Sequence, residues 1–395
     1  MELELLSPAG DLEKLKTAFY FGADAVYLGG PFMHLRATPT EFTMENLQSA
    51  IEFAHSLNKK VYVTVNAFAR NNDFGPLPEY LRELHRIGAD GIIVSDLGVI
   101  TLAAETVPEL PVHVSTQASC VNYVSANTYY KLGAKRVVLG REMSLDEIKE
   151  LRDKTPPELE LEAFVHGAMC MAYSGRCLIS SVLAGRDSNR GDCAQPCRWR
   201  YNIVEESRPN EYMPVFEDER GTTIMSSRDL KTIEFIDKII DAGITSFKIE
   251  GRMKSPYYVA TITNAYRKAL DHSAPIELLE DEILAASHRE FSTGFYFGKI
   301  KHEPPAPDGY KQNAQFTAVV LESDGEKVLI EQRNRFFLGD TLEILSPNSA
   351  GEKFVVEQMW DTEGNSVESA PHPQQKLYIK CDKKLAAGDI LRKRI

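Results

Sequence analysis

The chain has little of several features that would narrow its function early. No run approaches the roughly 18–20 consecutive apolar residues of a membrane-spanning helix. The opening residues 1–11 are acidic where a secretory signal would be basic. Positive charge is in deficit, because 45 Lys and Arg stand against 57 Asp and Glu, a net charge of −12. We therefore expect a cytoplasmic protein with no membrane partner, and the acidity disfavours non-specific binding of nucleic acid.

Signatures of the common hydrolases are also missing. The sequence contains no H-E-x-x-H and no G-x-S-x-G. Cysteine is scarce, at six in 395 residues, and two of the six, Cys120 and Cys381, stand alone. The other four gather in one glycine- and serine-rich segment with the spacing C-x6-C-x15-C-x3-C. They are Cys170, Cys177, Cys193 and Cys197.

The four clustered cysteines predict a metal centre. In a reducing compartment, clustered thiols are more often metal ligands than disulfides. Structural zinc favours paired C-x2–4-C knuckles, and only the last pair here has that form. Iron–sulfur clusters also take four thiolates and use varied spacings. The spacing alone does not distinguish a zinc site from an iron–sulfur cluster. The structural alternative is that the cysteines are small buried hydrophobic residues that bind no metal. That alternative is our interpretation of Cys120 and Cys381.

Short apolar runs alternate with amphipathic stretches along most of the chain. Eight runs are expected to be strands: Leu3–Leu6, Ala25–Leu28, Lys60–Val65, Gly91–Val94, Val112–Thr116, Arg136–Leu139, Glu160–Val165 and Ser246–Glu250. Helices are expected at Leu12–Phe21, Met44–Leu57, Leu77–Ile87, Val121–Leu132, Leu145–Lys154, Leu230–Ala242 and Tyr257–His272. Hydrophobic strands alternating with helices predict a parallel sheet, and eight of them fit an α/β fold of the (β/α)8 TIM-like barrel type. A doubly wound open sheet is the alternative, but no G-x-G-x-x-G follows the first strand.

A repeated phrase supports this phasing. The layout recurs as G-A-D-A-V-Y-L-G-G, G-A-D-G-I-I-V-S-D, G-A-K-R-V-V-L-G-R and G-I-T-S-F-K-I-E-G, which start at Gly22, Gly88, Gly133 and Gly243. In each copy we expect the glycine to end a helix in the left-handed conformation, just before a buried strand.

The pattern changes after Phe297. Pro304, Pro305 and Pro307 indicate a linker, and alternating apolar runs separated by D-G, L-G-D, N-S-A-G and A-A-G-D then predict a small C-terminal β-barrel domain. We expect a barrel over 1–300 that carries the four-cysteine insert at about 166–200, a linker over 301–310, and the β-barrel over 311–395.

Candidate site residues follow the predicted strands. A barrel of this type builds its working face at the carboxyl ends of its strands. Polar side chains are expected there, and Cys170 follows the strand Glu160–Val165 closely enough to place the metal centre at the barrel mouth. Binding candidates are Asn66, Gln117, Arg141 and Arg252, and catalytic candidates are His166, Tyr173 and Glu250.

Each candidate has a structural alternative. His166 is a proton donor or a hydrogen-bonding support for the loop. Arg252 binds an anion, or it pairs with Glu250 across strands. Asn66 and Gln117 bind substrate or occupy solvent-facing turns. Tyr173 acts in catalysis or packs around the metal loop.

Basic residues form local groups despite the overall acidity. Phosphate-binding candidates are Lys254 and, towards the end of the chain, Lys383, Lys384, Arg392, Lys393 and Arg394. Such clusters are also typical of solvated surfaces, which is the alternative here.

At these residues the chain resembles the peptidase U32 family. The resemblance is carried by Glu162, Phe164, Gly167, Cys170, Gly175, Cys177 and Ser180. Further matches are E-L-L-S-P-A-G-D, V-N-A-F, H-V-S-T-Q, R-G-D-C-A-Q-P-C-R, S-S-R-D-L and F-K-I-E-G-R-M-K-S-P-Y-Y-V. The family was first named for collagenase-like proteolysis. It also contains prephenate-dependent tRNA hydroxylases that modify the wobble uridine, a ribosomal-RNA cytidine hydroxylase and ubiquinone hydroxylation subunits.

A barrel with one small β domain looks most like the tRNA hydroxylase branch. The resemblance implies a 4Fe–4S cluster on the four clustered cysteines, with Cys197 at the position where some relatives differ. It implies hydroxylation of the wobble uridine at C5 to 5-hydroxyuridine, with tRNA as partner and prephenate as co-substrate. Prephenate is a dicarboxylate, so Arg36, Arg141 and Arg252 are candidates to bind it. A U32-type peptidase, a ribosomal-RNA hydroxylase and a non-catalytic metal-stabilised scaffold are the alternatives.

Overall fold

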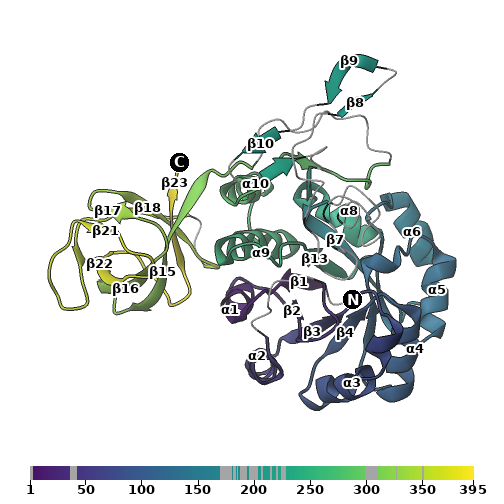
Figure 1. The fold of residues 1–395 in the computed structure, drawn as a ribbon. Coiled ribbons are helices and arrows are strands. Elements are labelled where there is room, and N and C mark those ends of the chain that lie inside the picture. Colours follow the sequence, from purple (N-terminus) through teal and green to yellow (C-terminus); the bar gives the residue numbers. More distant parts are fainter. Residues whose placement is uncertain are drawn as a thin grey trace. The chain divides into compact units, whose positions relative to one another are not determined.

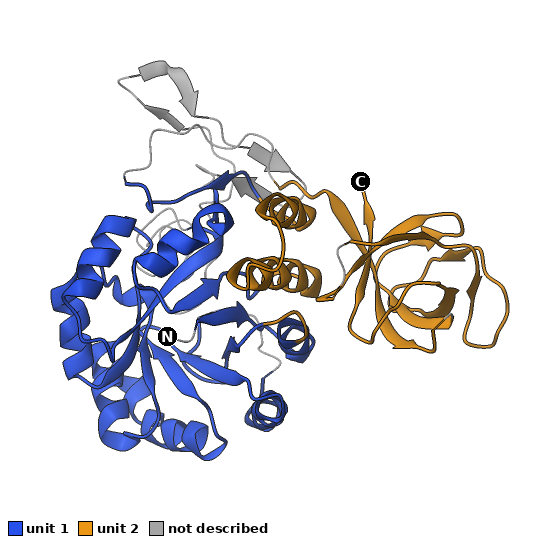
Figure 2. Cartoon of the chain, turned by 180° about the vertical axis from the view of Figure 1, so that it is seen from behind, with its two compact units in different colours: residues 1–19, 23–253, 289–309 blue, residues 20–22, 254–288, 310–395 orange. Residues whose placement is uncertain are grey.

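The computed structural model describes most of the chain in two compact units. The structure describes residues 3–35, 42–169, 228–298, 310–325, 327–348 and 351–395. It also describes the single residues Ser180, Ala184, Arg186 and Ala194, and the backbone of short strands between 203 and 223. The first unit comprises residues 1–19, 23–253 and 289–309, and the second comprises 20–22, 254–288 and 310–395 (Figure 2). The expected limits of barrel, linker and β domain stay a prediction. The linker itself lies outside the described residues.

Eight parallel strands close into a barrel in the first unit (Figure 1). Their order is β13-β1-β2-β3-β4-β5-β6-β7, and a further pairing of β13 with β7 completes the ring. The strands are β1 (Glu4–Pro8), β2 (Ala25–Gly29), β3 (Lys60–Val65), β4 (Gly91–Val94), β5 (Val112–Val114), β6 (Ala134–Val138), β7 (Glu160–Ala168) and β13 (Ser246–Ile249). The TIM-like barrel is confirmed, and all eight expected strands are present with small shifts at their ends.

Helices connect these strands, and several of them begin at a side-chain cap. They are α1 (Leu12–Tyr20), α2 (Met44–Ser56), α3 (Leu77–Arg86), α4 (Leu97–Thr106), α5 (Tyr123–Lys131), α6 (Leu145–Asp153) and α8 (Ile236–Asp241). The Thr43 side chain accepts from the Asn46 amide at 3.2 Å before α2. Ser144 and Glu147 form a reciprocal capping box at α6. Each cap satisfies backbone N–H groups that the first helical turn leaves unpaired.

The glycines of the repeated phrase adopt the predicted backbone. Gly22, Gly88, Gly133 and Gly243 have φ of +98°, +85°, +96° and +96°. L side chains rarely adopt this region, so each of the four positions favours glycine. At Gly243 a Cβ would also collide with the Arg152 side chain. The prediction that these glycines turn the chain from helix to strand is confirmed.

One expected helix is wrong at its start. The helix predicted over Leu230–Ala242 begins instead with strand β12 (Asp229–Lys231), which pairs antiparallel with β7, followed by the 3-10 turn η5 (Ile233–Phe235) and then α8. Asp229 forms a buried ion pair with Arg289 at 2.7 Å, and strand β14 (Phe291–Ser292) pairs with β12. These contacts outweigh the local helical pattern.

The second unit holds two helices and the expected C-terminal β domain. The helices are α9 (Pro256–Leu270) and α10 (Ile276–Ala285). Seven antiparallel strands form an open half-barrel in the order β19-β18-β23-β15-β16-β22-β20. They are β15 (Ala314–Ser323), β16 (Lys327–Gln332), β18 (Thr341–Leu345), β19 (Lys353–Val355), β20 (Met359–Trp360), β22 (Lys376–Lys380) and β23 (Ile390–Arg394).

The end of the chain is not a basic tail. Strand β23 pairs with β15 on one side and β18 on the other, so Arg392, Lys393 and Arg394 lie within the half-barrel. Within the parts of the chain that the structure describes, no helix is long and apolar enough to cross a membrane.

Candidate functional site

Arg252 occupies the mouth of the barrel, two residues after Glu250. Its side chain is buried; Nη2 donates to the Leu35 carbonyl at 2.7 Å, and Nη1 lies 3.4 Å from Thr64 Oγ1. A Cβ at Gly29 would lie 2.8 Å from Nη1, so the bare glycine makes room for the guanidinium. Arg36, the neighbouring candidate cation, lies outside the described residues.

Two residues at the mouth were missed by sequence reasoning. They are His34, whose Nε2 is buried without a hydrogen-bond partner among the described residues, and Tyr80, whose hydroxyl is buried close to the Phe32 backbone. Burial and the nearby Arg252 lower the pKa of His34 to about 4, so its ring is neutral near pH 7. A Cβ at Gly30 would collide with the Tyr80 hydroxyl. A search of the loop after β2 for titratable side chains would have found His34, whereas Tyr80 lies within α3 and gave no signal.

Three predicted binding residues carry unpaired polar atoms. Asn66 Oδ1, Gln117 Nε2 and Arg141 Nε are buried and have no hydrogen-bond partner among the described residues. Arg141 also donates from Nη1 to the Ala168 carbonyl at 2.7 Å and stacks on the Phe164 ring, 3.8 Å from its centroid. Leaving a buried polar atom unpaired costs about 1–3 kcal/mol. Donors and acceptors at the ends of β3, β5 and β6 therefore favour a polar ligand over a purely structural role.

The catalytic candidates lie in the wall of the barrel. His166 is only 1 % exposed and pairs through its backbone with β12 and β13, and its ring lies 5.5 Å from that of Phe291. Glu250 is partly buried, and its carboxylate accepts from the Tyr27 hydroxyl at 3.3 Å. The catalytic roles of His166 and Glu250 stay predictions. Tyr173 lies outside the described residues.

The four clustered cysteines, Cys170, Cys177, Cys193 and Cys197, also lie outside the described residues. Strand β7 ends at Ala168, two positions before the first of them. Within the segment, the buried Ser180 accepts a hydrogen bond through Oγ from the Ala194 amide at 3.0 Å. This bond joins the part of the segment that follows Cys177 to the part around Cys193. A cluster on the four cysteines of this segment stays a prediction from their spacing in the sequence.

The remaining thiols are buried. Cys120 is 1 % exposed, and burial raises its pKa to about 11. Cys381 is 2 % exposed, and burial likewise raises its pKa. Neither thiol is a nucleophile near neutral pH, because nucleophilic cysteines have a lowered pKa. Their interpretation as core thiols is confirmed. No group of three or more His, Cys, Asp or Glu side chains in the described residues could hold a metal ion.

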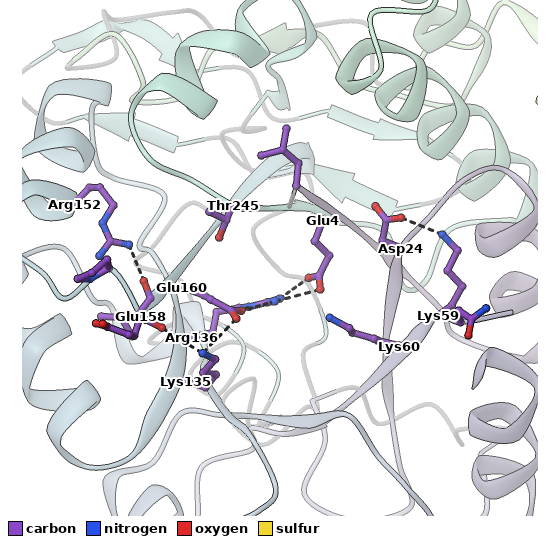
Figure 3. Close-up of a pocket in the computed structure, with 14 residues that line it drawn as sticks. Glu4, Asp24, Lys59, Lys60, Lys135, Arg136, Arg152, Glu158, Glu160 and Thr245 are labelled. Atoms are coloured by element: carbon purple, nitrogen blue, oxygen red, sulfur yellow. Dashed lines mark hydrogen bonds and ion pairs between the residues drawn. The ribbon is translucent and has the colours of Figure 1, made fainter. Parts of the chain in front are cut away.

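A pocket of about 440 Å³ lies at the opposite, amino-terminal end of the barrel (Figure 3). Its floor is the Arg136 guanidinium, which lies 2.5, 2.7 and 3.0 Å from carboxylate oxygens of Glu4, Glu160 and Glu162. Lys248 pairs with Glu162 at 2.7 Å. This end of a TIM barrel generally serves stability. Sequence reasoning missed the network, although charged residues inside apolar strands were its signal.

The predicted RNA-binding residues near the chain terminus are largely neutralised within the protein. Arg392 is fully buried and pairs with Glu282 and Glu343. Lys393 pairs with Asp340 at 2.5 Å. A phosphate would have to compete with these carboxylates for the same donors, which weakens the case for this strand as an RNA contact.

The other predicted RNA-binding residues are more varied. Arg394 pairs with Asp281 at 3.0 Å, and Lys383 lies 3.7 Å from Asp382. Lys384 is exposed. Lys254 donates to the Ser287 carbonyl at 3.3 Å and lies 4.4 Å from the centroid of the Tyr310 ring. An RNA-binding role for these residues stays a prediction.

Fold and site together define a class of protein. It is an α/β-barrel with a polar mouth, a four-cysteine segment after β7, and an antiparallel β domain. The chain belongs to peptidase family U32: the model of that family matches residues 10–304, and the model of the peptidase family U32 C-terminal domain matches residues 312–392.

Similarity to characterised relatives extends across both units. The chain is 40 % identical to tRNA hydroxylation protein P1 of Bacillus subtilis (strain 168), over 99 % of this chain and 94 % of that protein. It is 37 % identical to tRNA hydroxylation protein P of Escherichia coli (strain K12), over 93 % of this chain and 91 % of that protein. The 23S rRNA 5-hydroxycytidine C2501 synthase of Escherichia coli (strain K12) is 36 % identical, over 73 % of this chain and 42 % of that protein.

Proposed function

We propose that this chain is an iron–sulfur enzyme of tRNA modification, which hydroxylates the wobble uridine at C5 with prephenate as co-substrate. The observation that carries the proposal is the similarity to tRNA hydroxylation protein P1 over 99 % of this chain. A match that spans both units argues for a shared activity more strongly than a shared barrel would, since one barrel fold serves many chemistries.

The mouth of the barrel offers partners for a dicarboxylate. Arg141 presents an unpaired buried Nε, and Arg252 is held between Thr64 and the Leu35 carbonyl. Guanidinium groups bind carboxylates through charge-assisted hydrogen bonds that are about twice as strong as neutral ones. In the proposed complex, Arg141 binds one carboxylate of prephenate and Arg252 orients the other.

The same mouth offers partners for a uracil ring. Uracil presents an N–H donor flanked by two carbonyl acceptors. Asn66 Oδ1 is an unpaired acceptor after β3 and Gln117 Nε2 an unpaired donor after β5, on either side of β4 in the sheet. In the proposed complex they hold the base edge, while the neutral His34 adds a hydrogen bond without adding charge.

The four-cysteine segment fits the proposed cofactor. Cys170, Cys177, Cys193 and Cys197 would hold a 4Fe–4S cluster, which supplies one-electron redox chemistry when bound. Ser180 and Ala194, two residues of the segment that the structure does describe, are joined by a hydrogen bond of 3.0 Å.

A peptidase is less well supported. A thiol peptidase needs an activated thiolate. The two described thiols have raised pKa values instead, and the proposed cluster would use the other four. Hydroxylation of ribosomal RNA is the second candidate, since the 23S rRNA 5-hydroxycytidine C2501 synthase shares 36 % identity over 73 % of this chain.

The test measures modified nucleosides in cells that lack the protein. We expect the wild-type gene to restore 5-hydroxyuridine in tRNA, with ribosomal RNA unchanged. Protein purified without oxygen should contain about four iron and four sulfide per chain and absorb near 400 nm. Cys170→Ser should remove both the absorbance and the nucleoside.

The control separates cofactor from substrate. Arg141→Gln should keep iron and absorbance while lowering 5-hydroxyuridine, because its side chain binds prephenate and not the cluster. Restored hydroxycytidine in ribosomal RNA with unmodified tRNA would favour the second candidate. Gelatin cleavage that thiol blockers abolish, by protein without iron, would favour the peptidase.

A further inference from the structure

Three neighbouring strands of the half-barrel in the second unit have an outward face with an unusual composition. In β16 and β22 buried residues alternate with more exposed ones, and Val328, Ile330, Leu377 and Ile379 point into the core. The residues between them therefore share the outer face. Tyr378 pairs across the ladder with Leu329 on one side and with Trp360 of β20 on the other.

Two aromatic rings and three lysines lie on this face, which we call the aromatic–lysine face. Besides Leu329 and Glu331, it contains Lys327, Trp360, Lys376, Tyr378 and Lys380. Lys327 Nζ lies 4.3 Å from the centroid of the Tyr378 ring and 5.6 Å from that of Trp360. Lys327 is opposite Lys380 in the register, so positive charges flank the rings.

The lysines of this face differ from the basic residues of β23. Within the described part of the chain, no carboxylate lies within ion-pair distance of Lys327, Lys376 or Lys380. The acidic side chain on the same face, Glu331, is paired with Arg333 at 2.8 Å. The face thus carries uncompensated positive charge next to stacking surfaces, although the protein is acidic as a whole.

We propose that the aromatic–lysine face binds single-stranded RNA, with bases stacked on Tyr378 and Trp360 and phosphates held by the lysines. Sheets that present aromatic side chains to unpaired bases are a general solution to RNA binding, and stacking tolerates any base. A base on Tyr378 displaces Lys327 Nζ from the ring towards a phosphate. A protein partner fits less well, because the cores of protein interfaces are depleted in lysine.

The identity of the RNA rests on the proposed function, in which it is the anticodon loop of tRNA. The loop is single-stranded and contains the wobble uridine. Holding it on the β domain would fix the RNA through sequence-tolerant contacts.

Tryptophan fluorescence tests the stacking directly. The chain has two tryptophans, Trp199 and Trp360, so Trp199→Phe leaves Trp360 as the sole emitter. An unmodified anticodon stem-loop RNA should quench this emission on binding. In the full-length protein, Tyr378→Ser should raise the dissociation constant for the RNA about tenfold. Tyr378→Phe keeps the ring and should bind as the wild type does.

Charge is tested with two matched triple variants. Lys327→Gln, Lys376→Gln and Lys380→Gln together should lower the slope of log Kd against log salt by about 2. Lys131→Gln, Lys149→Gln and Lys353→Gln remove the same charge from exposed sites elsewhere and should change the slope little. Thermal unfolding of each variant shows whether the fold is kept.

Each outcome bears on the inference separately from the proposed function. Unquenched Trp360, or equal dissociation constants for Tyr378→Ser and wild type, overturns the RNA-binding face even if 5-hydroxyuridine still forms in cells. Quenching and weakened binding in a protein that modifies no tRNA would support the face while refuting the proposed function.

Discussion

At the scale of single residues, the mouth of the barrel depends on the absence of a side chain at Gly29 as much as on the side chains around it. Gly29 has no side chain, and the Arg252 guanidinium and the His34 ring occupy the space around it; a Cβ there would lie 2.8 Å from Nη1 and 3.1 Å from His34 Cδ2. Arg252 Nη1, the nearest atom, is the movable end of a side chain, whereas His34 also presents its Cβ at 3.1 Å, so a substitution would displace the Arg252 guanidinium first.

Gly29→Ala should therefore impair binding more than stability. We expect the KM for prephenate to rise at least several-fold, because Arg252 is pushed from its place, while the melting temperature changes by only a few degrees. Gly75→Ala is the matched control, since its φ is −62° and a Cβ there meets nothing closer than 4.0 Å. Equal kinetics for the two variants would show that Gly29 has no part in placing Arg252.

His34 makes a prediction about pH. Burial, with Arg252 nearby, lowers its pKa from 6.5 to about 4, so between these values the unfolded chain binds the proton and the folded chain does not. Folding stability then decreases as the pH falls through this window. NMR titration of the ring should give a midpoint near 4, and His34→Gln should flatten the fall in the urea midpoint between pH 6.5 and 4. A ring that titrates near 6.5 would contradict the neutral, partly buried His34 of the site.

At the scale of elements, distant partners decide what local patterns leave open. Arg392 looked like part of a solvated basic tail because I-L-R-K-R carries three charges in sequence. Its partners Glu282 and Glu343 lie 110 and 49 positions away, and β23 pairs with β15 and β18, so its place depends on contacts that the local sequence does not show. In the same way, Asp229 pairs with Arg289, 60 positions away, and lies in strand β12, where the local sequence predicted the start of a helix.

Elements with a strong local signal were predicted well for the opposite reason. Lys60–Val65 and Gly91–Val94 are strands with the expected limits, because a short, nearly continuous apolar run indicates a buried strand from the local sequence. The site was predicted in part. Asn66, Gln117, Arg141 and Arg252 follow strands that the sequence reveals, whereas Tyr80 reaches the mouth from a helix.

Strand β23 should depend strongly on its buried arginine. Arg392→Met leaves Glu282 and Glu343 without the guanidinium that they share, so we expect a loss of about 3–5 kcal/mol in the free energy of unfolding of the second unit. Lys384→Met, at an exposed position, should cost less than about 0.5 kcal/mol. Urea unfolding of both variants measures the difference, and similar costs would mean that the buried cluster is not what holds β23.

At the scale of the whole molecule, acidity and RNA binding are compatible because charge is distributed unevenly. Several arginines and lysines are already paired with carboxylates inside the fold, at Arg136, Lys248 and Arg392. The net charge of −12 therefore says little about any one surface. What a polyanion meets is the cations that no carboxylate neutralises, and among the described residues Lys327, Lys376 and Lys380 of the aromatic–lysine face are three such cations.

The closed barrel is itself held by charge. Glu4 on β1 and Glu162 on β7 both pair with Arg136 of β6, while Ser246 of β13 donates to Glu4 at 2.9 Å. These strands include both members of the pairing that completes the ring, β13 with β7. Arg136 thus links the first strand of the barrel, β1, to β7 and β13, which come much later in the sequence.

Replacing Arg136 should lower the free energy of unfolding more than replacing its partner Glu4. Arg136→Met leaves buried carboxylates uncompensated and should cost about 3–5 kcal/mol. Glu4→Gln leaves Arg136 with Glu160 and Glu162, so we expect only about 1–3 kcal/mol. Urea unfolding near neutral pH measures both losses. If Arg136→Met cost no more than Glu4→Gln, Arg136 would not be the central residue of this ion-pair network.

Acid should reduce the contribution of Glu4. Burial acts to raise the pKa of Glu4, but Arg136 and hydrogen bonds from Tyr62 and Ser246 outweigh it, and the folded-state pKa lies below the ordinary 4.5. The stabilisation is complete above the unfolded pKa and is lost as the pH falls through the lower folded one. Wild-type protein should therefore lose more stability than Glu4→Gln when the pH is lowered below about 4.5, so that the two urea midpoints approach one another in acid. Midpoints that stay equally far apart at every pH would mean that Glu4 stabilises the barrel through its shape rather than its charge.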